Sequence, residues 1–262
     1  MRIARFAHSS GMSFGVVEGE PAAGPAGLTV AEIDGHPFGE LRFTGQRWAV
    51  ADVRLLSPIL PSKVVCVGRN YADHAAELGN DVPKEPLLFL KPSTSIIGPN
   101  DAIRLPPQSQ QVEHEAELAV VIGVTGARRV DRAGAAAAIF GYTCANDVTA
   151  RDLQRKDVQF TRAKSFDSFC PIGPWIVTGV DVGDVEVRCE VNEEVRQLGR
   201  TKDMVFDVLT LVSYVSHVMT LLPGDVILTG TPAGVGPLAA GDEVVVSVEG
   251  VGALSNKVLT LD

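Results

Sequence analysis

The chain has 262 residues, of which 45% are hydrophobic and 21% charged, and a formal net charge of -9. This composition is typical of a globular protein that buries a sizeable core, and without a Lys/Arg cluster beyond Arg128-Arg129 it argues against a nucleic-acid partner. The start MRIARFAHSSGMSFG lacks the apolar core of a signal peptide, and no segment reaches the ~18 apolar residues of a membrane span, so we expect a cytoplasmic protein that acts on small molecules.

Residues 1–60 predict short strands separated by Gly- and Pro-rich turns, among them IARFA, FGVVEG, LTVAEI and LRFTG. The run Leu60-Pro61-Ser62 then leads into KVVCVG, whose continuous apolar character indicates a buried strand. We therefore predict a small N-terminal β-rich domain over residues 1–60 and a main domain over residues 61–262.

The next segment, RNYADHAAELG, predicts a short helix from about Ala72 to Leu78 that Gly79 ends. His74 and Glu77 are three residues apart, so they lie side by side on one helical face. Such a pair is either an exposed surface couple or a functional one.

The stretch VEHEAELAVVIG, residues 112–123, places Glu113, Glu115 and Glu117 at every second position. The β-branched run at its end favours a strand, in which the three glutamates share one face. One interpretation is the solvated face of a half-buried strand. The other is a cation site, because like charges held together on one face repel unless a cation lies nearby.

Further along, a small Ala-rich helix is predicted near Ala135–Ile139, and Asp147 follows the strand-like YTCA. Lys164 lies between Phe160 and Phe166. One clear helix is predicted over Val208–Leu221 with Asp207 as its N-cap. The glycines of GTPAGVG precede a turn and a strand rather than a helix, so we predict a ligand-contacting turn rather than a dinucleotide loop. Strands outnumber helices, which predicts a mainly β protein with some helix (α+β).

The cysteines and the acids suggest different metals. Four cysteines (Cys66, Cys144, Cys170, Cys189) form no CxxC pair, so we expect buried reduced thiols rather than disulfides or a zinc site. Two same-face glutamates with an aspartate from a neighbouring strand end would instead suit a hard ion such as Mg²⁺. Spacing alone does not select Asp147 from the other acids.

Six ordered blocks together carry a family resemblance: VCVGRNYADHAAELG, LFLKPSTSIIGP, VEHEAELAVVIG, GYTCANDVTARDLQ, TRAKSFDSFCPIGP and GDVILTGTPAGVG. From about Lys63 to its end the chain resembles the fumarylacetoacetate hydrolase family. It is most similar to the branch of acylpyruvate hydrolases, oxaloacetate decarboxylases and 2-hydroxyhepta-2,4-diene-1,7-dioate isomerases. The resemblance implies a mixed β-sandwich or roll as the catalytic domain, a small extra N-terminal domain as in some members, and a homodimer.

The resemblance also implies roles for eleven residues. The metal ligands would be Glu115, Glu117 and Asp147, which leaves Glu113 without a family role, as a solvated residue or one behind the ligands. The catalytic residues would be His74 and Glu77 on a lid helix, together with Lys164. Residues in segments that line the substrate pocket are Arg69, Tyr71, Lys91, Gln154 and Thr231.

These roles predict chemistry on a small 2-oxo acid that binds Mg²⁺ or Mn²⁺ through its carboxylate and 2-keto oxygens. We place C–C hydrolysis of an acylpyruvate or fumarylpyruvate first, through a metal-stabilised pyruvate enolate. Oxaloacetate decarboxylation and isomerisation of a dienol acid are the alternatives. Arg69, the stretch Gln154-Arg155-Lys156 and the DVPKEP loop are candidates for reading the far end of the substrate, where basic residues would favour a second carboxylate.

A hypothesis of a different class is a non-catalytic relative that binds a ligand without turnover. Such a relative would be expected to lose His74 or Glu77 before it loses its core, and both residues are present. We therefore expect an enzyme.

Overall fold

Two strands show the burial patterns that organise the fold. β15 (Glu186–Val191) alternates between half-buried and buried residues, as expected for a strand with one solvated face. β11 (Ala116–Ile122) is buried at every residue, which requires cover on both faces. In this computed structural model, which describes residues 1–20 and 27–261, β11 lies inside a large sheet and β15 belongs to a second sheet packed against it.

The large sheet contains twelve strands, ten of them in the order β4-β3-β2-β1-β14-β12-β11-β17-β6-β7, with β5 paired to β1 and β8 to β14. Its N-terminal strands are β1 (Arg2–His8), β2 (Gly11–Glu18), β3 (Thr29–Ile33), β4 (Phe43–Ala49) and β5 (Arg54–Leu56). Besides β11, the others are β6 (Val64–Gly68), β7 (Leu87–Lys91), β8 (Ile96–Ile97), β12 (Ile139–Asn146), β14 (Cys170–Val177) and β17 (Val226–Leu228).

Two smaller sheets complete the strands. The five-stranded sheet has the order β16-β15-β19-β20-β9 and adds β16 (Glu194–Arg200), β19 (Glu243–Val248), β20 (Gly252–Thr260) and β9 (Ile103–Leu105). The three-stranded sheet has the order β13-β10-β18 and consists of β13 (Thr149–Ala150), β10 (Val112–His114) and β18 (Gly236–Pro237). Parallel pairs such as β17 with β6 occur beside antiparallel ones, so the predicted mixed β-sandwich is confirmed.

The two faces of β11 belong to different core clusters. Leu118, Val120 and Ile122 join the larger cluster, which also contains residues of β15 and β19. Ala119 and Val121 point the other way, into a second cluster with residues of β6, β14 and β17. Because side chains alternate along a strand, Glu117 shares the face of Ala119 and Val121.

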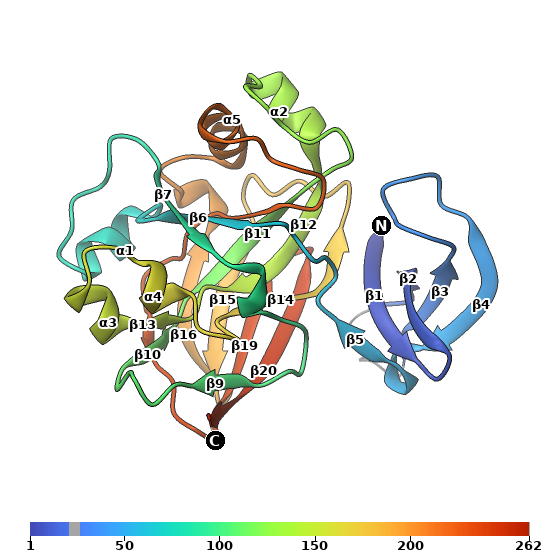
Figure 1. Ribbon diagram of the computed structural model, residues 1–262, viewed down its shortest axis with the longest axis horizontal. Helices are drawn as coiled ribbons and strands as arrows, with labels where there is room; N and C mark the ends of the chain where they lie inside the picture. The colour runs from blue at the N-terminus through green and yellow to red at the C-terminus, as the bar shows by residue number, and fades with distance from the viewer. Residues whose placement is uncertain (21–26, 262) are drawn as a thin grey trace.

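The helices are short and lie outside the sheets. They are α1 (Ala72–Glu77), α2 (Arg132–Ala138), α3 (Arg151–Lys156), α4 (Thr161–Lys164) and α5 (Val208–Val218), with 3-10 turns η3 (Val50–Asp52), η4 (Ser93–Ser95) and η5 (Thr201–Asp203). α1, α3 and α4 gather on the left of the main domain in Figure 1, whereas the N-terminal strands project to the right. Among the described residues no helix is long and apolar enough to cross a membrane.

The N-terminal strands extend the large sheet through a short contact. Arg2 and Ile3 of β1 pair with Val177 and Ile176 of β14. The predicted division of the chain at about residue 60 therefore falls inside one continuous sheet, and independent folding of residues 1–60 stays a prediction.

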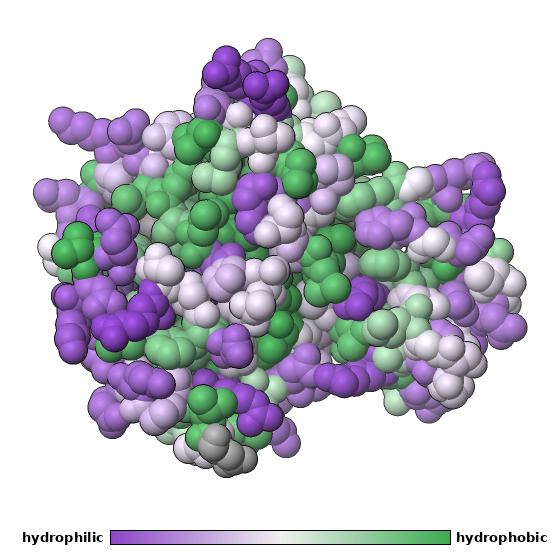
Figure 2. All heavy atoms as spheres, viewed as in Figure 1, coloured by the Kyte–Doolittle hydropathy of each residue, from purple (hydrophilic) through white to green (hydrophobic). Residues whose placement is uncertain are grey.

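The outer surface mixes polar and apolar residues. Figure 2 shows hydrophilic residues along the edges of one face and hydrophobic residues gathered over the middle of the main domain. Leu87 and Leu90 of β7, the last strand of the large sheet, are exposed.

Candidate metal centre and active-site cavity

Antiparallel pairing of β11 with β12 brings the predicted metal ligands together. The register sets Glu117 opposite Ala145 and Ala116 opposite Asn146. One step further, the backbone N–H of Asp147 donates to the carbonyl of Glu115 at 2.9 Å, so these two residues face each other across the strand ends. One carboxylate oxygen from each of Glu115, Glu117 and Asp147 lies within 4.8 Å of the other two.

The glutamates do not form a solvated face. Glu113, Glu115 and Glu117 are 6%, 4% and 2% exposed, so this interpretation and the solvated role considered for Glu113 are wrong. The predicted single strand is also interrupted at Glu115, because residues 112–114 pair with β13 and β18 while residues 116–122 pair with β12 and β17. The chain therefore changes strand partners at Glu115, one of the clustered carboxylates.

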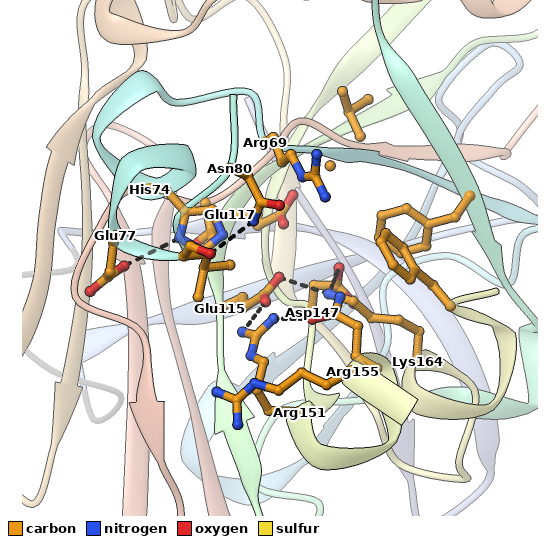
Figure 3. A pocket seen from close by; sticks show the side chains of 17 residues that line it. Arg69, His74, Glu77, Asn80, Glu115, Glu117, Asp147, Arg151, Arg155 and Lys164 are labelled. Atoms are coloured by element: carbon orange, nitrogen blue, oxygen red, sulfur yellow. Dashed lines mark hydrogen bonds and ion pairs between the residues drawn. The ribbon is translucent and has the colours of Figure 1, made fainter. Parts of the chain in front are cut away.

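Three buried cations, Lys91, Arg151 and Lys164, surround the cluster, and Figure 3 shows two of them, Arg151 and Lys164. Lys164 Nζ donates to Glu115 Oε2 at 2.8 Å and to Asp147 Oδ2 at 2.7 Å. Lys91 Nζ donates to Asp147 Oδ1 at 2.6 Å. Arg151 donates through Nη2 to Glu115 Oε1. Burial of these charges is tolerated because each is paired and hydrogen-bonded.

The ligands differ in how they are compensated. Burial works to raise the pKa of Glu115, but attraction to Lys164 and Arg151 outweighs it and holds this pKa well below its ordinary value. Burial, reinforced by repulsion from Asp147 and Glu115, holds the pKa of Glu117 well above its ordinary value. Glu117 accepts a hydrogen bond from the Gly230 N–H at 2.6 Å, and the described residues offer it no ion pair.

The donor set fits a hard divalent cation. Three carboxylates supply oxygen ligands, and Mg²⁺ and Mn²⁺ accept such a shell. The buried carboxylates Glu113, Glu115, Glu117 and Asp147 outnumber the buried cations Lys91, Arg151 and Lys164 by one. A cation bound at Glu117 would balance the charge of the fourth carboxylate. It would also offset the burial and the repulsion that raise the pKa of Glu117.

The predicted His–Glu pair lies beside this cluster. His74 Nδ1 is 3.3 Å from Glu77 Oε2 on α1, and His74 is only 4% exposed, whereas Glu77 is exposed, so the pair runs from the buried side of the helix to its surface. The Gly234 N–H donates to Glu77 Oε1 at 3.0 Å, which ties α1 to the glycine-rich turn after β17. Figure 3 shows His74 directed toward Glu117 and Glu77 directed away from it.

A cavity of about 380 Å³ joins these groups. Nine of the eleven predicted site residues line it: Arg69, His74, Glu77, Glu115, Glu117, Asp147, Gln154, Lys164 and Thr231. Tyr71 and Lys91 are buried outside its lining. Lys91 instead supports Asp147, and the Tyr71 hydroxyl has no hydrogen-bond partner among the described residues. A direct substrate contact for either residue stays a prediction.

Sequence reasoning missed several residues of the cavity and its support. Arg151, Asn80, Phe89 and Phe160 line the cavity without having been assigned a role. Gln197, fully buried on β16, was missed entirely. Its amide accepts from the Ala116 N–H at 3.0 Å and donates to Thr231 Oγ1 at 2.7 Å, so it joins β11 to the glycine-rich turn. The one signal in the sequence that could have pointed to Arg151 is that several buried carboxylates need a positively charged partner.

A buried cluster of three carboxylates next to a lysine and a His–Glu pair, at the strand ends of a mixed β-sandwich, defines a candidate metal-dependent enzyme site. The family described as fumarylacetoacetate (FAA) hydrolase, C-terminal, matches residues 63–259, and the family described as Rv2993c-like, N-terminal, matches residues 1–58. The chain therefore belongs to the fumarylacetoacetate hydrolase family.

Its relatives include enzymes with different reactions. The crystal structure of 2-hydroxyhepta-2,4-diene-1,7-dioate isomerase from Mycobacterium marinum is 53% identical, with a TM-score of 0.93 over 99% of this chain and 98% of that one. Human mitochondrial oxaloacetate tautomerase FAHD2A is 48% identical over 80% of this chain and 70% of its own. Fumarylpyruvate hydrolase from Pseudomonas aeruginosa, solved with Mn²⁺ and pyruvate, is 33% identical, with a TM-score of 0.72 over 76% of this chain and 90% of its own.

Proposed function

We propose that this chain is a divalent-metal-dependent enzyme that moves a proton on a small, enolisable 2-oxo acid. The observation that carries the proposal is that the three-carboxylate cluster and the His74–Glu77 pair line one cavity. Glu115, Glu117 and Asp147 would hold Mg²⁺ or Mn²⁺. The bound ion would supply Lewis-acid polarisation of the 2-keto oxygen.

Lys164 would add fixed positive charge beside the acid's oxygens. Its ammonium is fully buried and held by Glu115 and Asp147, and it also lies 5.0 Å from the centre of the Phe89 ring. Burial works to lower the pKa of Lys164, but attraction to Asp147 and Glu115 outweighs it and raises this pKa, so the ammonium stays charged. A preorganised cation of this kind stabilises negative charge that develops on a substrate oxygen.

His74 would act as the general acid–base group. Because Nδ1 faces Glu77, Nε2 is left to exchange a proton with the substrate. Removal of a proton from C3 of the 2-oxo acid and delivery of a proton to its 2-keto oxygen gives the enol form, and the reverse transfers give the keto form. In a dienol acid, transfer of a proton from the enol oxygen to a carbon further along the conjugated chain would move the double bonds, which is the reaction of an isomerase.

The relatives favour tautomerisation or isomerisation over the C–C hydrolysis that the sequence placed first. The named isomerase and tautomerase are 53% and 48% identical to the chain, and the fumarylpyruvate hydrolase is 33% identical. In both reactions the His74–Glu77 pair would carry a proton, and no water would have to attack the substrate. We therefore propose keto–enol or double-bond isomerisation as the first activity.

Hydrolysis is the second candidate, supported by the hydrolase that was solved with Mn²⁺ and pyruvate. In that reaction His74 would take a proton from a water that attacks the C4 carbonyl. The C3–C4 bond would then break, its electron pair would leave on the enolate of pyruvate, and C3 would take up a proton. The same cavity and the same pair would serve both reactions.

Two arginines support a substrate with a second carboxylate. Arg69 lines the cavity, and no acid among the described residues pairs with it. Arg155 also lines the cavity, and its guanidinium donates to the neutral Gln111 amide at 3.0 Å. Figure 3 shows the two arginines on opposite sides of the carboxylate cluster. Guanidinium groups without an acidic partner suit an incoming carboxylate.

One experiment separates these activities. Metal-stripped protein is assayed with and without Mn²⁺ or Mg²⁺, following enol-to-keto conversion of oxaloacetate by ultraviolet absorbance and pyruvate release from fumarylpyruvate and from oxaloacetate. Metal-dependent enol conversion without pyruvate supports the isomerase, and pyruvate from fumarylpyruvate supports the hydrolase. Pyruvate from oxaloacetate alone would indicate decarboxylation, and no metal-dependent change with any substrate would contradict the proposal.

We further propose that the chain forms a cytoplasmic homodimer. β7 is the last strand in the order of the large sheet, and its apolar side chains Leu87 and Leu90 are exposed, which leaves this edge open to a second copy of the chain. Light scattering that gives the mass of a single chain would exclude the dimer.

A further inference from the structure

Glu113 is a fourth buried acid that belongs to no proposed role. It lies on β10, two residues before Glu115, and its oxygens are not among those of the three-carboxylate cluster. Its Oε1 accepts from Gln111 Nε2 at 2.6 Å, and its Oε2 accepts from Arg151 Nε at 2.7 Å. Each of its oxygens therefore has a hydrogen-bond donor of its own.

Arg151 connects this acid to the proposed metal ligand. The guanidinium is 2% exposed, and each of its three nitrogens has one partner: Nε has Glu113, Nη2 has Glu115, and Nη1 has Gln154 Oε1 at 2.6 Å. The backbone N–H of Arg151 also donates to the Gln111 carbonyl at 2.7 Å. Figure 3 shows the Arg151 side chain reaching Glu115 from below.

The Nε–Nη2 edge of an arginine ordinarily binds both oxygens of one carboxylate. Here Glu113 and Glu115 share that edge, so Glu115 receives a single hydrogen bond from Arg151. Its other oxygen faces Lys164 and the cluster. Without Glu113, Arg151 would have Glu115 as its one carboxylate partner and would be free to bind both of its oxygens.

We propose that Glu113 is a positioning residue that limits the grip of Arg151 on Glu115 and thereby keeps Glu115 available to a divalent cation. This inference rests on the proposed function. Loss of the Glu113 charge should weaken cation binding by two routes. It reduces the negative charge near the cluster, and it leaves the Arg151 guanidinium free to bind both oxygens of Glu115, a proposed metal ligand. Gln154, held by the same guanidinium, would lose its fixed position as well.

The test compares variants of the metal-stripped full chain by titration with Mn²⁺. Glu113→Gln keeps the size of the side chain and removes its charge, and we expect it to raise the Kd for Mn²⁺ about 10- to 100-fold, as for other residues that hold metal ligands in place. Glu113→Asp keeps the charge and should restore much of the affinity. Asp152→Asn is the matched control, because Asp152 lies on α3 but accepts from Ser109 Oγ and the Gln110 N–H rather than from Arg151.

The outcomes separate the inference from the proposed function. A wild-type Kd in Glu113→Gln, or an equal rise in Asp152→Asn, would overturn the role of Glu113 alone. A merely structural role would lower the melting temperature of metal-free Glu113→Gln and leave the Kd unchanged. Wild-type protein that binds no Mn²⁺ would overturn the proposed function together with this inference.

Discussion

His74 has one ring nitrogen engaged with Glu77 and the other available to the cavity. Replacement by glutamine keeps a polar side chain of similar reach but removes proton exchange. We expect His74→Gln to lower kcat by about 10²- to 10⁴-fold, the usual contribution of general acid–base catalysis. The measurement is turnover of the substrate found in the activity assay, at saturating Mn²⁺.

The control for this variant is His217→Gln, on the exposed face of α5, which should turn over as the wild type does. The Kd for Mn²⁺ should be unchanged in both variants, because neither histidine belongs to the carboxylate cluster. Wild-type turnover in His74→Gln would show that the pair is not the proton carrier.

The site was partly predictable because strand periodicity is local and pairing register is not. Alternation along the chain set Glu115 and Glu117 on one face, and helical spacing set His74 beside Glu77. The place of Asp147 opposite Glu115 depends on the register of β11 with β12, so its selection came from the family resemblance. The sharing of Arg151 between two acids depends on three-dimensional packing and left no spacing signal.

At the scale of elements, the predicted helices exist but their ends shift. The predicted helix to Leu221 ends at Val218, because Leu221 exchanges backbone hydrogen bonds with Ala127 and Pro223 follows. The predicted helix near Ala135–Ile139 begins earlier, at Arg132, where Asp131 accepts from the Gly134 N–H. Tertiary pairing and capping decide such boundaries, and neither appears in residue periodicity.

The glycine-rich turn gives an element-scale prediction. Gly234 has a φ of 98°, and a Cβ there would collide with the carbonyl oxygen of Arg196. Because its N–H holds Glu77, Gly234→Ala should lower both stability and turnover. The matched control is Gly241→Ala, because Gly241 has a φ of 99° but open space around it. This variant should lose only about 1 kcal/mol of unfolding free energy, from placing a residue with a Cβ at a positive φ.

Urea unfolding and kinetics on the two variants check this prediction. The expected result is a larger loss of unfolding free energy in Gly234→Ala, together with a loss of turnover that Gly241→Ala does not show. Equal losses in the two variants would mean that contact with Arg196 and Glu77 contributes nothing beyond the positive φ.

The N-cap of α5 gives a prediction with a defined pH dependence. Asp207 accepts from the Thr210 N–H at 2.8 Å, as predicted for an N-cap, and from the Arg132 guanidinium. Hydrogen bonds from Arg132, against a smaller effect of burial, hold the pKa of Asp207 below its usual range. A lowered folded-state pKa stabilises the fold above the unfolded pKa of about 3.9, and this stabilisation is lost as the pH falls further.

Asp207→Ala should therefore lower the free energy of unfolding by about 0.5–2 kcal/mol at pH 7, with a difference from wild type that shrinks below pH about 4. Asp207→Asn keeps an equally good cap without the charge, so it should lose less and vary less with pH. Chemical unfolding at pH 7 and pH 3 measures both effects. A difference between wild type and Asp207→Ala that grows on acidification would contradict this account.

On the scale of the whole molecule, the site lies where segments distant in sequence meet. The cavity is lined by residues from segments that are far apart in the chain: β6 and α1, the junction of β10 and β11, the end of β12, α3 with α4, and the turn after β17. Burial and the neighbouring carboxylates disfavour the charged form of Glu117 at their meeting point, and a bound cation would stabilise that form in the folded state. Metal binding should therefore stabilise the entire main domain rather than a local loop.

We expect Mn²⁺ to raise the melting temperature of the metal-stripped protein. A ligand that binds only the folded state stabilises it by about 2.7 kcal/mol at a free concentration of 100 Kd. Scanning calorimetry at rising Mn²⁺ concentrations measures the shift, and Ca²⁺-free buffer with a chelator gives the baseline.

Asp147→Asn is the informative variant for this measurement, because it has two opposing effects. It removes one repelling charge from the neighbourhood of Glu117 and one ligand from the ion. It also leaves Lys91 and Lys164 with a weaker partner, so the metal-free variant loses two buried charge-assisted contacts. The loss of the Mn²⁺-induced shift, rather than the metal-free melting temperature, therefore reports the cation site. A full shift in Asp147→Asn would place the ion away from the junction of β11 and β12.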